Sequence, residues 1–474
     1  MSIWLPILVL LSIIFVVIST VRWRLHPFLA LIFASYLFGL LSGTKLSEIV
    51  KSIADGFGGT LSSIGIVIAA GTIIGTFLEK SGGVLSLAEF VLKITKRKNV
   101  PLAVDIIGYM TAIPMVCDSG FITLSPLNRV LTKRAKLSLS TTTIALSLGL
   151  YATHTMPPTP GPVAAAGILG ADLGLTIMLG FLASIPAVIV GWLFSIKVAS
   201  KIYIEPDDES TDEGIKERLK EAPSVFKSLL PIILPIVLIL LKSISDLQTM
   251  PFGNGGFREF ISLVGHPITA LLIGVVIAFT MPKKLTRDVI SINGWVGDAI
   301  FRAGSIILIT AAGGAFGKVL QNSGIADIVG TSLSKANLGI WLPALIAAIL
   351  KTAQGSSTVA IITTASLLSP LMNSLGFSSP IAKALTVVAI GAGSMIASHA
   401  NDSYFWVVTQ SSKMDVKTGY RLHTFGTLLQ GLASVITVWI MSLFIIDIDR
   451  RGDSNFCKLE RNHLPSFLLT NILD

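Results

Sequence analysis

The sequence has few charged residues. Asp, Glu, Lys and Arg together make up 13% of its 474 residues, whereas a soluble domain averages about 25%. Hydrophobic residues make up 52%, and 42 glycines add to the apolar majority. This composition excludes a soluble globular enzyme, and so apolar a chain is not a disordered one. The sequence therefore predicts an integral membrane protein.

Cysteine and the common catalytic motifs are also scarce. Cys117 and Cys457 are the only two cysteines, and their separation gives neither a disulfide framework nor zinc-ligand spacing. The GxSxG and HExxH patterns of hydrolases are absent, as is the GxxxxGK[ST] run that binds nucleotide phosphates. We therefore expect no cofactor, no metal site and no ATP-driven step, and we do not expect an enzyme.

Long apolar runs predict an all-α polytopic membrane protein. A helix needs about 20 apolar residues to cross the hydrocarbon layer. A charged stretch separates two sets of such runs, and a polar tail follows the last. We expect a first transmembrane repeat in residues 1–200, a cytoplasmic linker in 201–227, a second repeat in 228–446 and the tail in 447–474. The predicted spans are 3–21, 25–42, 60–78, 138–156 and 173–196, then 229–241, 261–280, 306–320, 381–397 and 422–446.

The two halves are predicted to form an inverted repeat. Residues 70–75 align without a gap on 312–317, and residues 152–154 align on 397–399. Each half has about five transmembrane helices, a broken helix and one re-entrant hairpin, the hairpins being 100–117 with 121–131 and 339–353 with 358–371. Because five is an odd number of crossings, the second half starts on the opposite face. Most basic residues then lie on one face, which the positive-inside rule makes cytoplasmic. Placed between apolar runs, they do not indicate a nucleic-acid surface.

Four short polar or proline-rich breaks interrupt the apolar runs, two in each half. They are residues 117–120, 154–162, 354–358 and 398–403. Non-helical backbone at membrane depth is tolerated only where it is buried in protein or lines a wet cavity, so we expect the breaks to converge. A helix that restarts near Val163 would offer a carboxylate its positive N-terminus. The predicted substrate-binding residues are Ser119, Gly120, Thr159, Gly161, Gln354, Gly355, Ser356, Ser357, Thr358, Asn401 and Ser403.

Ionisable residues inside the predicted spans are candidates for ion coupling, because a charge is costly to bury there. Asp118, His154, His399 and Asp402 are the predicted proton-coupling residues. For each histidine, a structural hydrogen bond is the alternative. Lys351 is predicted to be a charge partner, and it would either attract a substrate carboxylate or pair with an aspartate.

The chain resembles the gluconate permease family, the gluconate:proton symporters of the ion transporter superfamily. The similarity covers nearly the whole chain, to about residue 446. The residues that carry it include His26–Leu31, Gly71–Gly75, Pro157-Pro158 with Pro160-Gly161-Pro162, Gly265–Ala270, Gly313–Phe316, Gly355–Ala360 and Asp402-Ser403.

The resemblance implies proton-coupled transport of gluconate or a related small acid, with a fold of inverted repeats and paired hairpins. Two positions depart from the family pattern. The family tends to have Glu-Val-Gly where this chain has Asp118-Ser119-Gly120, and His where Thr159 stands. Both differences lie in the predicted site, which leaves room for a smaller hydroxy acid such as glycerate.

The leading hypothesis is therefore a proton-coupled symporter in the bacterial inner membrane. It would carry gluconate or a related hydroxy acid into the cell by alternating access, with the acid, the proton and the lipid bilayer as its partners. A sodium-coupled carboxylate carrier is the nearest alternative. A passive channel and an intramembrane hydrolase that uses Ser356 with His399 are the others. The sequence leaves the oligomeric state open, a homodimer included.

Overall fold

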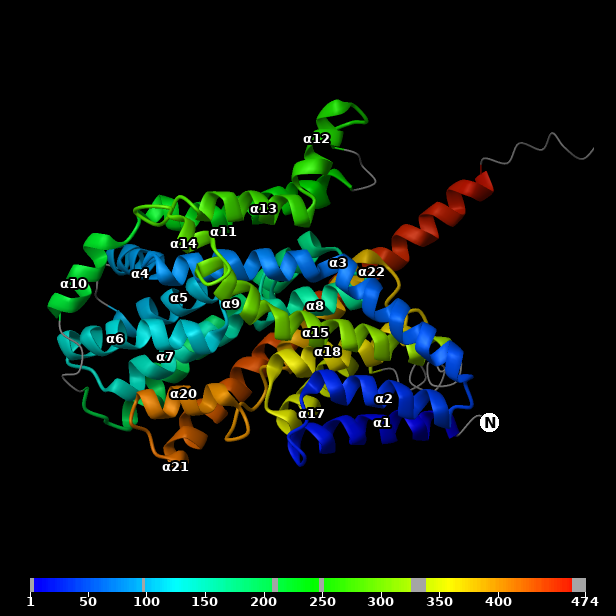
Figure 1. The fold of residues 1–474 in the computed structure, drawn as a ribbon, viewed down its shortest axis with the longest axis horizontal. Helices are drawn as coiled ribbons and strands as arrows, with labels where there is room; N and C mark the ends of the chain where they lie inside the picture. Colours follow the sequence, from blue (N-terminus) through cyan, green and yellow to red (C-terminus); the bar gives the residue numbers. More distant parts are fainter. Residues whose placement is uncertain (1–3, 96–98, 207–211, 247–250, 325–337, 463–474) are drawn as a thin grey trace, which may run out of the picture.

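A computed structural model of the chain describes residues 4–95, 99–206, 212–246, 251–324 and 338–462 (Figure 1). Within these ranges every regular element is a helix, which confirms the all-α prediction. Five helical segments among them are long and apolar enough to cross a membrane. They are residues Leu46–Lys80, Leu173–Lys201, Val225–Ser245, Arg287–Asn322 and Val416–Phe444.

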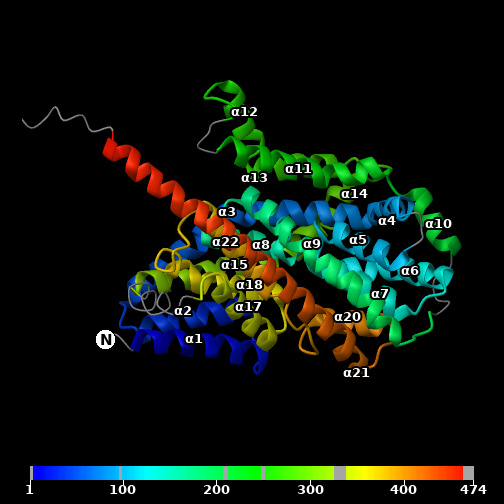
Figure 2. The same ribbon diagram turned by 180° about the vertical axis from the view of Figure 1, so that it is seen from behind.

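Two long helices, α3 (Leu46–Lys80) and α15 (Trp295–Asn322), pack against each other through the middle of the molecule. Glycines permit their close approach: a Cβ atom on Gly314 would collide with Thr60 and with the Gly56 carbonyl oxygen. Helices α11 (Val225–Ser245) and α13 (Pro267–Ala278) lie on one side of this pair. Helices α1 (Trp4–Val21) and α2 (Pro27–Leu41) lie on the other, as Figures 1 and 2 both show.

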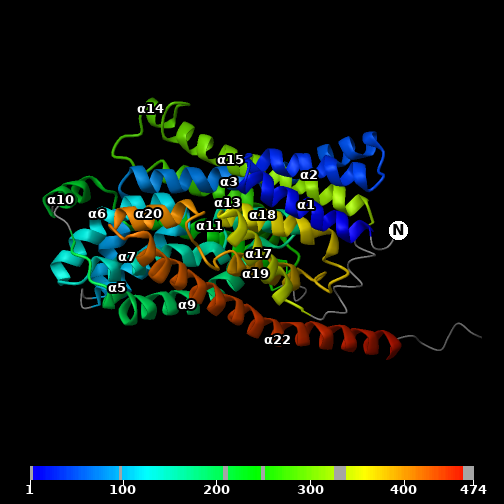
Figure 3. The same ribbon diagram turned by 90° about the horizontal axis from the view of Figure 1, so that it is seen from below.

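The packing of one half recurs in the other. Helix α2 packs on α15, and its counterpart α13 packs on α3. Helix α5 (Val100–Ala112) packs on α7 (Leu139–Tyr151), as α17 (Trp341–Gln354) packs on α19 (Pro380–Gly393). Helix α7 in turn contacts α9 (Leu173–Lys197), as α19 contacts α22 (Phe425–Asn462), which runs along one edge of the bundle in Figure 3.

The legs of each predicted hairpin are helices that contact each other. Helix α5 is followed by α6 (Cys117–Ala135), and α17 by α18 (Ser357–Leu368). Shorter helices complete the described chain. They are α4 (Gly83–Ile94), α8 (Pro160–Leu169), α10 (Asp212–Glu221), α12 (Gly256–Val264), α14 (Arg287–Ile290), α20 (Ser403–Ser411) and α21 (Val416–Gly419), with a π-helical turn over Tyr420–Thr424.

Several helical boundaries differ from the sequence prediction. Helix α15, for example, begins at Trp295, whereas the predicted span begins at residue 306. The span predicted as residues 261–280 is α12 and α13, which meet at an angle of 63°. Pro267 is the reason, because proline disfavours a helical conformation in the residue before it. Helix α3 begins at Leu46, whereas the predicted span begins at residue 60. The first turns of α3 carry Lys51 and Asp55, so they are not part of the uninterrupted apolar run on which the prediction was based.

The linker and the tail extend partly beyond the described residues. Helix α10 lies within the predicted linker, of which residues 207–211 are outside the described residues. The predicted tail begins inside α22, which continues to Asn462, and residues 463–474 are outside the described residues.

Candidate substrate site

A cavity of about 450 Å³ lies where residues of the four predicted breaks meet. The first predicted break, residues 117–120, is the first turn of α6, and the non-helical backbone there is residues 113–116. Pockets of roughly 300–1,000 Å³ are typical of small-molecule sites. The first two breaks and the last two contribute almost equally to its walls, so both halves of the chain build it. The lining residues from the breaks are Cys117, Asp118, His154, Thr159, Pro160, Gly161, Pro162, Gln354, Gly355, Ser356, Ser357, Thr358, Asn401, Asp402 and Ser403.

Four helices begin at this cavity. They are α6, α8, α18 and α20, and each contributes residues of its first turn to the wall. The first N–H groups of a helix have no partner within the helix, and the helix dipole makes this end positive. Helix α8 offers fewer donors than the others because Pro160 and Pro162 lack an N–H. The convergence of four N-termini suits an anionic group such as a carboxylate.

The local sequence explains why helices begin at these positions. Ser356 caps α18, and its side chain accepts a hydrogen bond from the Val359 N–H at 3.3 Å. Asp402 caps α20 in the same way by accepting from the Tyr404 N–H at 3.1 Å. Thr159 precedes Pro160, the first residue of α8, and proline is favoured at this position. Serine, threonine and aspartate are among the residues that favour helix starts.

Gly355 allows the second hairpin to turn against the last break. Its φ of +84° lies in the left-handed region, and a Cβ atom there would collide with the Asn401 carbonyl oxygen. Glycine is therefore required for two reasons, the backbone conformation and the close approach.

Substitution Gly355→Ala is expected to abolish transport and to lower stability by more than the roughly 1–2 kcal/mol of a left-handed alanine. Gly376→Ala is the matched control, because Gly376 has φ +78° and has no atom within 4 Å of its ideal Cβ position. Melting temperature and uptake should be measured for both variants. Equal effects of the two substitutions would show that the contact with Asn401 is unimportant.

Lys351 and Asp402 form a buried ion pair beside the cavity. The Lys351 side chain is fully buried, and its Nζ donates to Asp402 Oδ2 at 2.6 Å and to the Gly355 carbonyl at 2.5 Å. Ser398 Oγ donates to the same carboxylate oxygen at 2.5 Å. Of the two roles predicted for Lys351, the geometry matches pairing with an aspartate.

Asp118 joins the start of α6 to the start of α20. It lies in the first turn of α6, and its Oδ2 accepts a hydrogen bond from Ser403 Oγ at 2.9 Å. The side chain is half-buried and lines the cavity. Asp118 is thus a carboxylate in direct reach of a ligand, whereas Asp402 is already held by Lys351 and Ser398.

The two predicted histidines have different positions. His154 lines the cavity, and its Nδ1 lies 2.8 Å from the Tyr151 carbonyl oxygen. His399 does not line the cavity. Its Nε2 donates to the Thr352 carbonyl at 3.0 Å, which also accepts from Asn401 Nδ2 at 2.8 Å. His399 therefore caps the end of α17, in agreement with the structural alternative.

Four of the predicted site residues lie outside the cavity wall: Lys351 and His399, described above, and Ser119 and Gly120. Gly120 is buried against the Leu150 side chain, and Ser119 lines a neighbouring cavity.

Gln354 has an unusual environment. Both Oε1 and Nε2 of its side chain are buried, and neither has a hydrogen-bond partner among the residues that the structure describes. Buried amides are nearly always hydrogen-bonded, so this side chain is a candidate for binding a polar ligand in the cavity.

The sequence prediction missed two tyrosines of the cavity wall and one buried histidine behind it. Tyr151 and Tyr404 line the cavity with parallel rings 5.5 Å apart, and the Tyr151 hydroxyl lies 2.8 Å from Ser357 Oγ. His423 is fully buried on the π-helical turn, with Nε2 3.1 Å from Ser398 Oγ. His423 had a signal, since it is an ionisable residue within the predicted span 422–446. The tyrosines had none.

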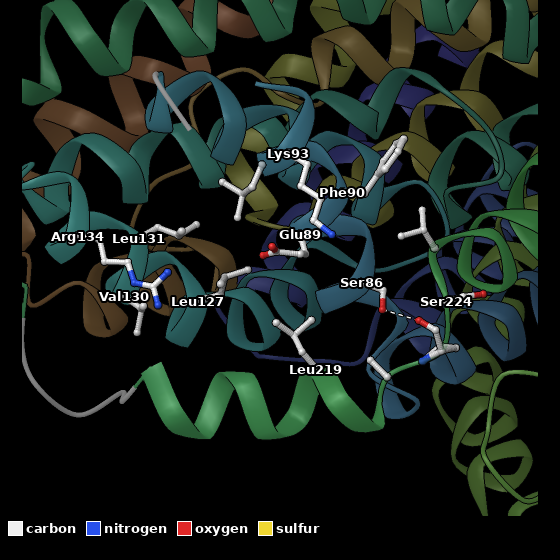
Figure 4. Close-up of a pocket in the computed structure, with 14 residues that line it drawn as sticks. Ser86, Glu89, Phe90, Lys93, Leu127, Val130, Leu131, Arg134, Leu219 and Ser224 are labelled. Carbon is white, nitrogen blue, oxygen red and sulfur yellow. Dashed lines mark hydrogen bonds between the residues drawn. The ribbon is translucent and has the colours of Figure 1, made fainter. Parts of the chain in front are cut away.

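A larger cavity of about 590 Å³ lies beside the linker helix α10 and is lined by residues of α4, α6 and α10 (Figure 4). Its wall combines apolar residues such as Phe90 and Leu219 with Glu89, Lys93 and Arg134. Ser86 Oγ donates to the Pro223 carbonyl at its edge, at 2.5 Å. None of the predicted site residues lines it.

Comparison with known proteins gives the family and the fold of the chain. The family described as GntP family permease matches residues 4–444. A gluconate permease of Pseudomonas aeruginosa is 34% identical over 441 residues, which cover 92% of this chain and 97% of the relative. The inner membrane permease YgbN of Escherichia coli is 32% identical, with 91% and 96% covered. The YdaH transporter of Alcanivorax borkumensis shares the fold, with a TM-score of 0.64, 14% identity, and 88% and 98% covered.

Proposed function

Because the chain belongs to the GntP family of permeases, we propose that it imports gluconate or a related small hydroxy acid together with protons. A permease of this family with several long apolar helices is a multi-pass protein of the bacterial inner membrane and not an enzyme. The observation that carries the substrate class is the convergence of four helix N-termini on one cavity, which favours a carboxylate.

The rest of the cavity wall fits a polyhydroxylated solute. Ser356, Ser357 and Thr358 present hydroxyl groups that both donate and accept hydrogen bonds. Gln354 lies in the same wall, and its buried amide has no hydrogen-bond partner among the described residues, so a rotation of this side chain toward the cavity would give a ligand two donors and an acceptor. Relatives named as gluconate permeases support gluconate as the first substrate to test, and glycerate is the second.

Asp118 is the proposed proton carrier. Its carboxylate faces the cavity and is held by a neutral serine hydroxyl. Asp402 is paired with Lys351. The His399 side chain donates to the Thr352 carbonyl at the end of α17. His154 lines the cavity and is the second candidate.

Alternating access is the proposed transport mechanism. The recurring contacts of α2 with α15 and of α13 with α3 support an inverted repeat. Carriers with such repeats move one part of the bundle against the other around a site near the membrane midplane.

Uptake of labelled gluconate into proteoliposomes under an imposed pH gradient tests the proposal. We expect accumulation above equilibrium that collapses when a protonophore dissipates the gradient. Uptake that ignores the gradient but stops when choline replaces sodium would instead support the sodium-coupled carrier. Equilibration without accumulation under either gradient would support a passive channel.

The hydrolase alternative has no support in the geometry. Ser356 Oγ accepts a hydrogen bond from the Val359 N–H, and His399 Nε2 donates to the Thr352 carbonyl. His399 is also absent from the cavity wall that Ser356 lines.

A further inference from the structure

A second cavity, of about 380 Å³, adjoins the candidate site. Its wall includes Thr72, Thr76 and Glu79 of α3, Ser119 of α6 and Arg302 of α15. The two cavities share wall residues, namely Met115, Val116, Asp118, Pro160 and Ile306. We call this second cavity the vestibule. It adjoins the site at Asp118. Its other two charged residues, Glu79 and Arg302, lie near the ends of α3 and α15 that the Lys80–Asp298 ion pair joins.

Arg302 is the cation of the vestibule wall. Its Nη1 donates to Glu79 Oε2 at 3.0 Å and lies 3.5 Å from Ser119 Oγ. These contacts connect α15 to α3 and to the start of α6. A guanidinium group carries five N–H donors, and both contacts use Nη1, so the group can bind a carboxylate without leaving Glu79.

Arg302 is the positive charge that an anion entering the vestibule would meet, because the neighbouring charges are paired with one another or lie deeper. Asp298, four residues earlier on α15, is ion-paired with Lys80. Glu79 is paired with Arg302 itself, and Asp118 lies deeper, at the boundary with the candidate site. The Arg302 side chain is 43% exposed and that of Glu79 is 22% exposed. Ion pairs as exposed as this one contribute little to stability, so a structural role does not account for the arginine.

We propose that the vestibule is a second carboxylate subsite, in which Arg302 binds the anionic substrate as it passes between solution and the candidate site. This inference rests on the proposed function. Arginine matches the planar, two-oxygen geometry of a carboxylate. Glu79 orients the guanidinium group, and its negative charge repels the substrate carboxylate beside it, so binding in the vestibule is reversible.

The test is gluconate exchange in everted and in right-side-out membrane vesicles, which needs no ion gradient. We expect Arg302→Gln to raise the KM by at least about tenfold, the loss of a hydrogen-bonded charge, at the face where the vestibule opens. The KM at the other face, the maximal rate and the melting temperature should stay near wild type. Arg302→Lys should recover part of the effect, because it keeps the charge but loses the fork geometry.

Lys318 provides the matched control. It lies sixteen residues later on the same helix, outside both cavities, and donates to Gln321 Oε1 at 2.9 Å. Lys318→Gln should leave the KM at the vestibule face unchanged. Glu79→Gln should lower that KM, because it removes the negative charge that repels the substrate carboxylate; this variant also decides the question if Arg302→Gln fails to fold.

Two results would overturn the inference: a wild-type KM for Arg302→Gln at both faces, or an unchanged or raised KM for Glu79→Gln. Both presuppose that wild-type vesicles exchange gluconate. If wild-type vesicles do not exchange gluconate, the proposed function itself fails. A failure of the vestibule inference alone therefore differs from a failure of the proposed function.

Discussion

Substitution Lys351→Met is expected to abolish gluconate uptake and to destabilise the protein by about 3–5 kcal/mol, the range for breaking a buried ion pair. Lys351 is fully buried, and its Nζ contacts Asp402 and the Gly355 carbonyl. Its removal leaves a buried carboxylate without its cation and releases the tip of the second hairpin. Thermal unfolding in detergent and uptake in proteoliposomes measure the two effects.

The double variant Lys351→Met with Asp402→Asn separates stability from transport. Replacement of a whole buried pair by neutral groups is often neutral or stabilising, and asparagine still caps the start of α20. We therefore expect the melting temperature to return most of the way to wild type while uptake stays low. If Lys351→Met alone kept wild-type stability, the result would contradict the burial of the Lys351–Asp402 ion pair away from water.

Substitution Asp118→Asn is expected to abolish accumulation driven by a pH gradient and to leave gluconate exchange measurable. Asparagine keeps an oxygen that accepts from Ser403 Oγ, as Asp118 does now at 2.9 Å, but it carries no titratable proton. Exchange moves substrate in both directions without net proton movement, so it needs the binding site alone. The ratio of accumulation to exchange is the quantity to measure.

Ser403→Ala is the control for Asp118→Asn. It removes the hydrogen bond between α6 and α20 and keeps the carboxylate, so accumulation should persist with altered kinetics. Normal accumulation by Asp118→Asn would move the proton site to His154, which also lines the cavity, or to Asp402.

The apolar spans were predictable because the hydrocarbon layer imposes both length and composition. The errors lie where a local feature outweighs average hydropathy. Pro267 divides one predicted span into α12 and α13, and charges in the first turns of α3 hide its true start. The contact between α3 and α15 depends on glycines 56 and 314, whose spatial relation no one-dimensional pattern contains.

The meeting of the four breaks was predictable from a physical rule, that broken backbone within a membrane must be buried or line a cavity. The direction of each side chain was not. His399 turns toward the end of α17 and Lys351 toward Asp402, because both satisfy hydrogen bonds that exist only in the folded chain. Arg302 was missed because a basic residue near the end of an apolar run is indistinguishable, in sequence, from a topology signal.

A structure of the protein with bound gluconate tests the central claim most directly, that the substrate lies where the four helix N-termini meet. We predict ligand density in the 450 Å³ cavity, with the carboxylate against the first turn of α6 or α18 and the hydroxyl groups near Gln354 and Ser356. Ligand density in the cavity beside α10 (Figure 4), with the cavity at the breaks empty, would contradict the account.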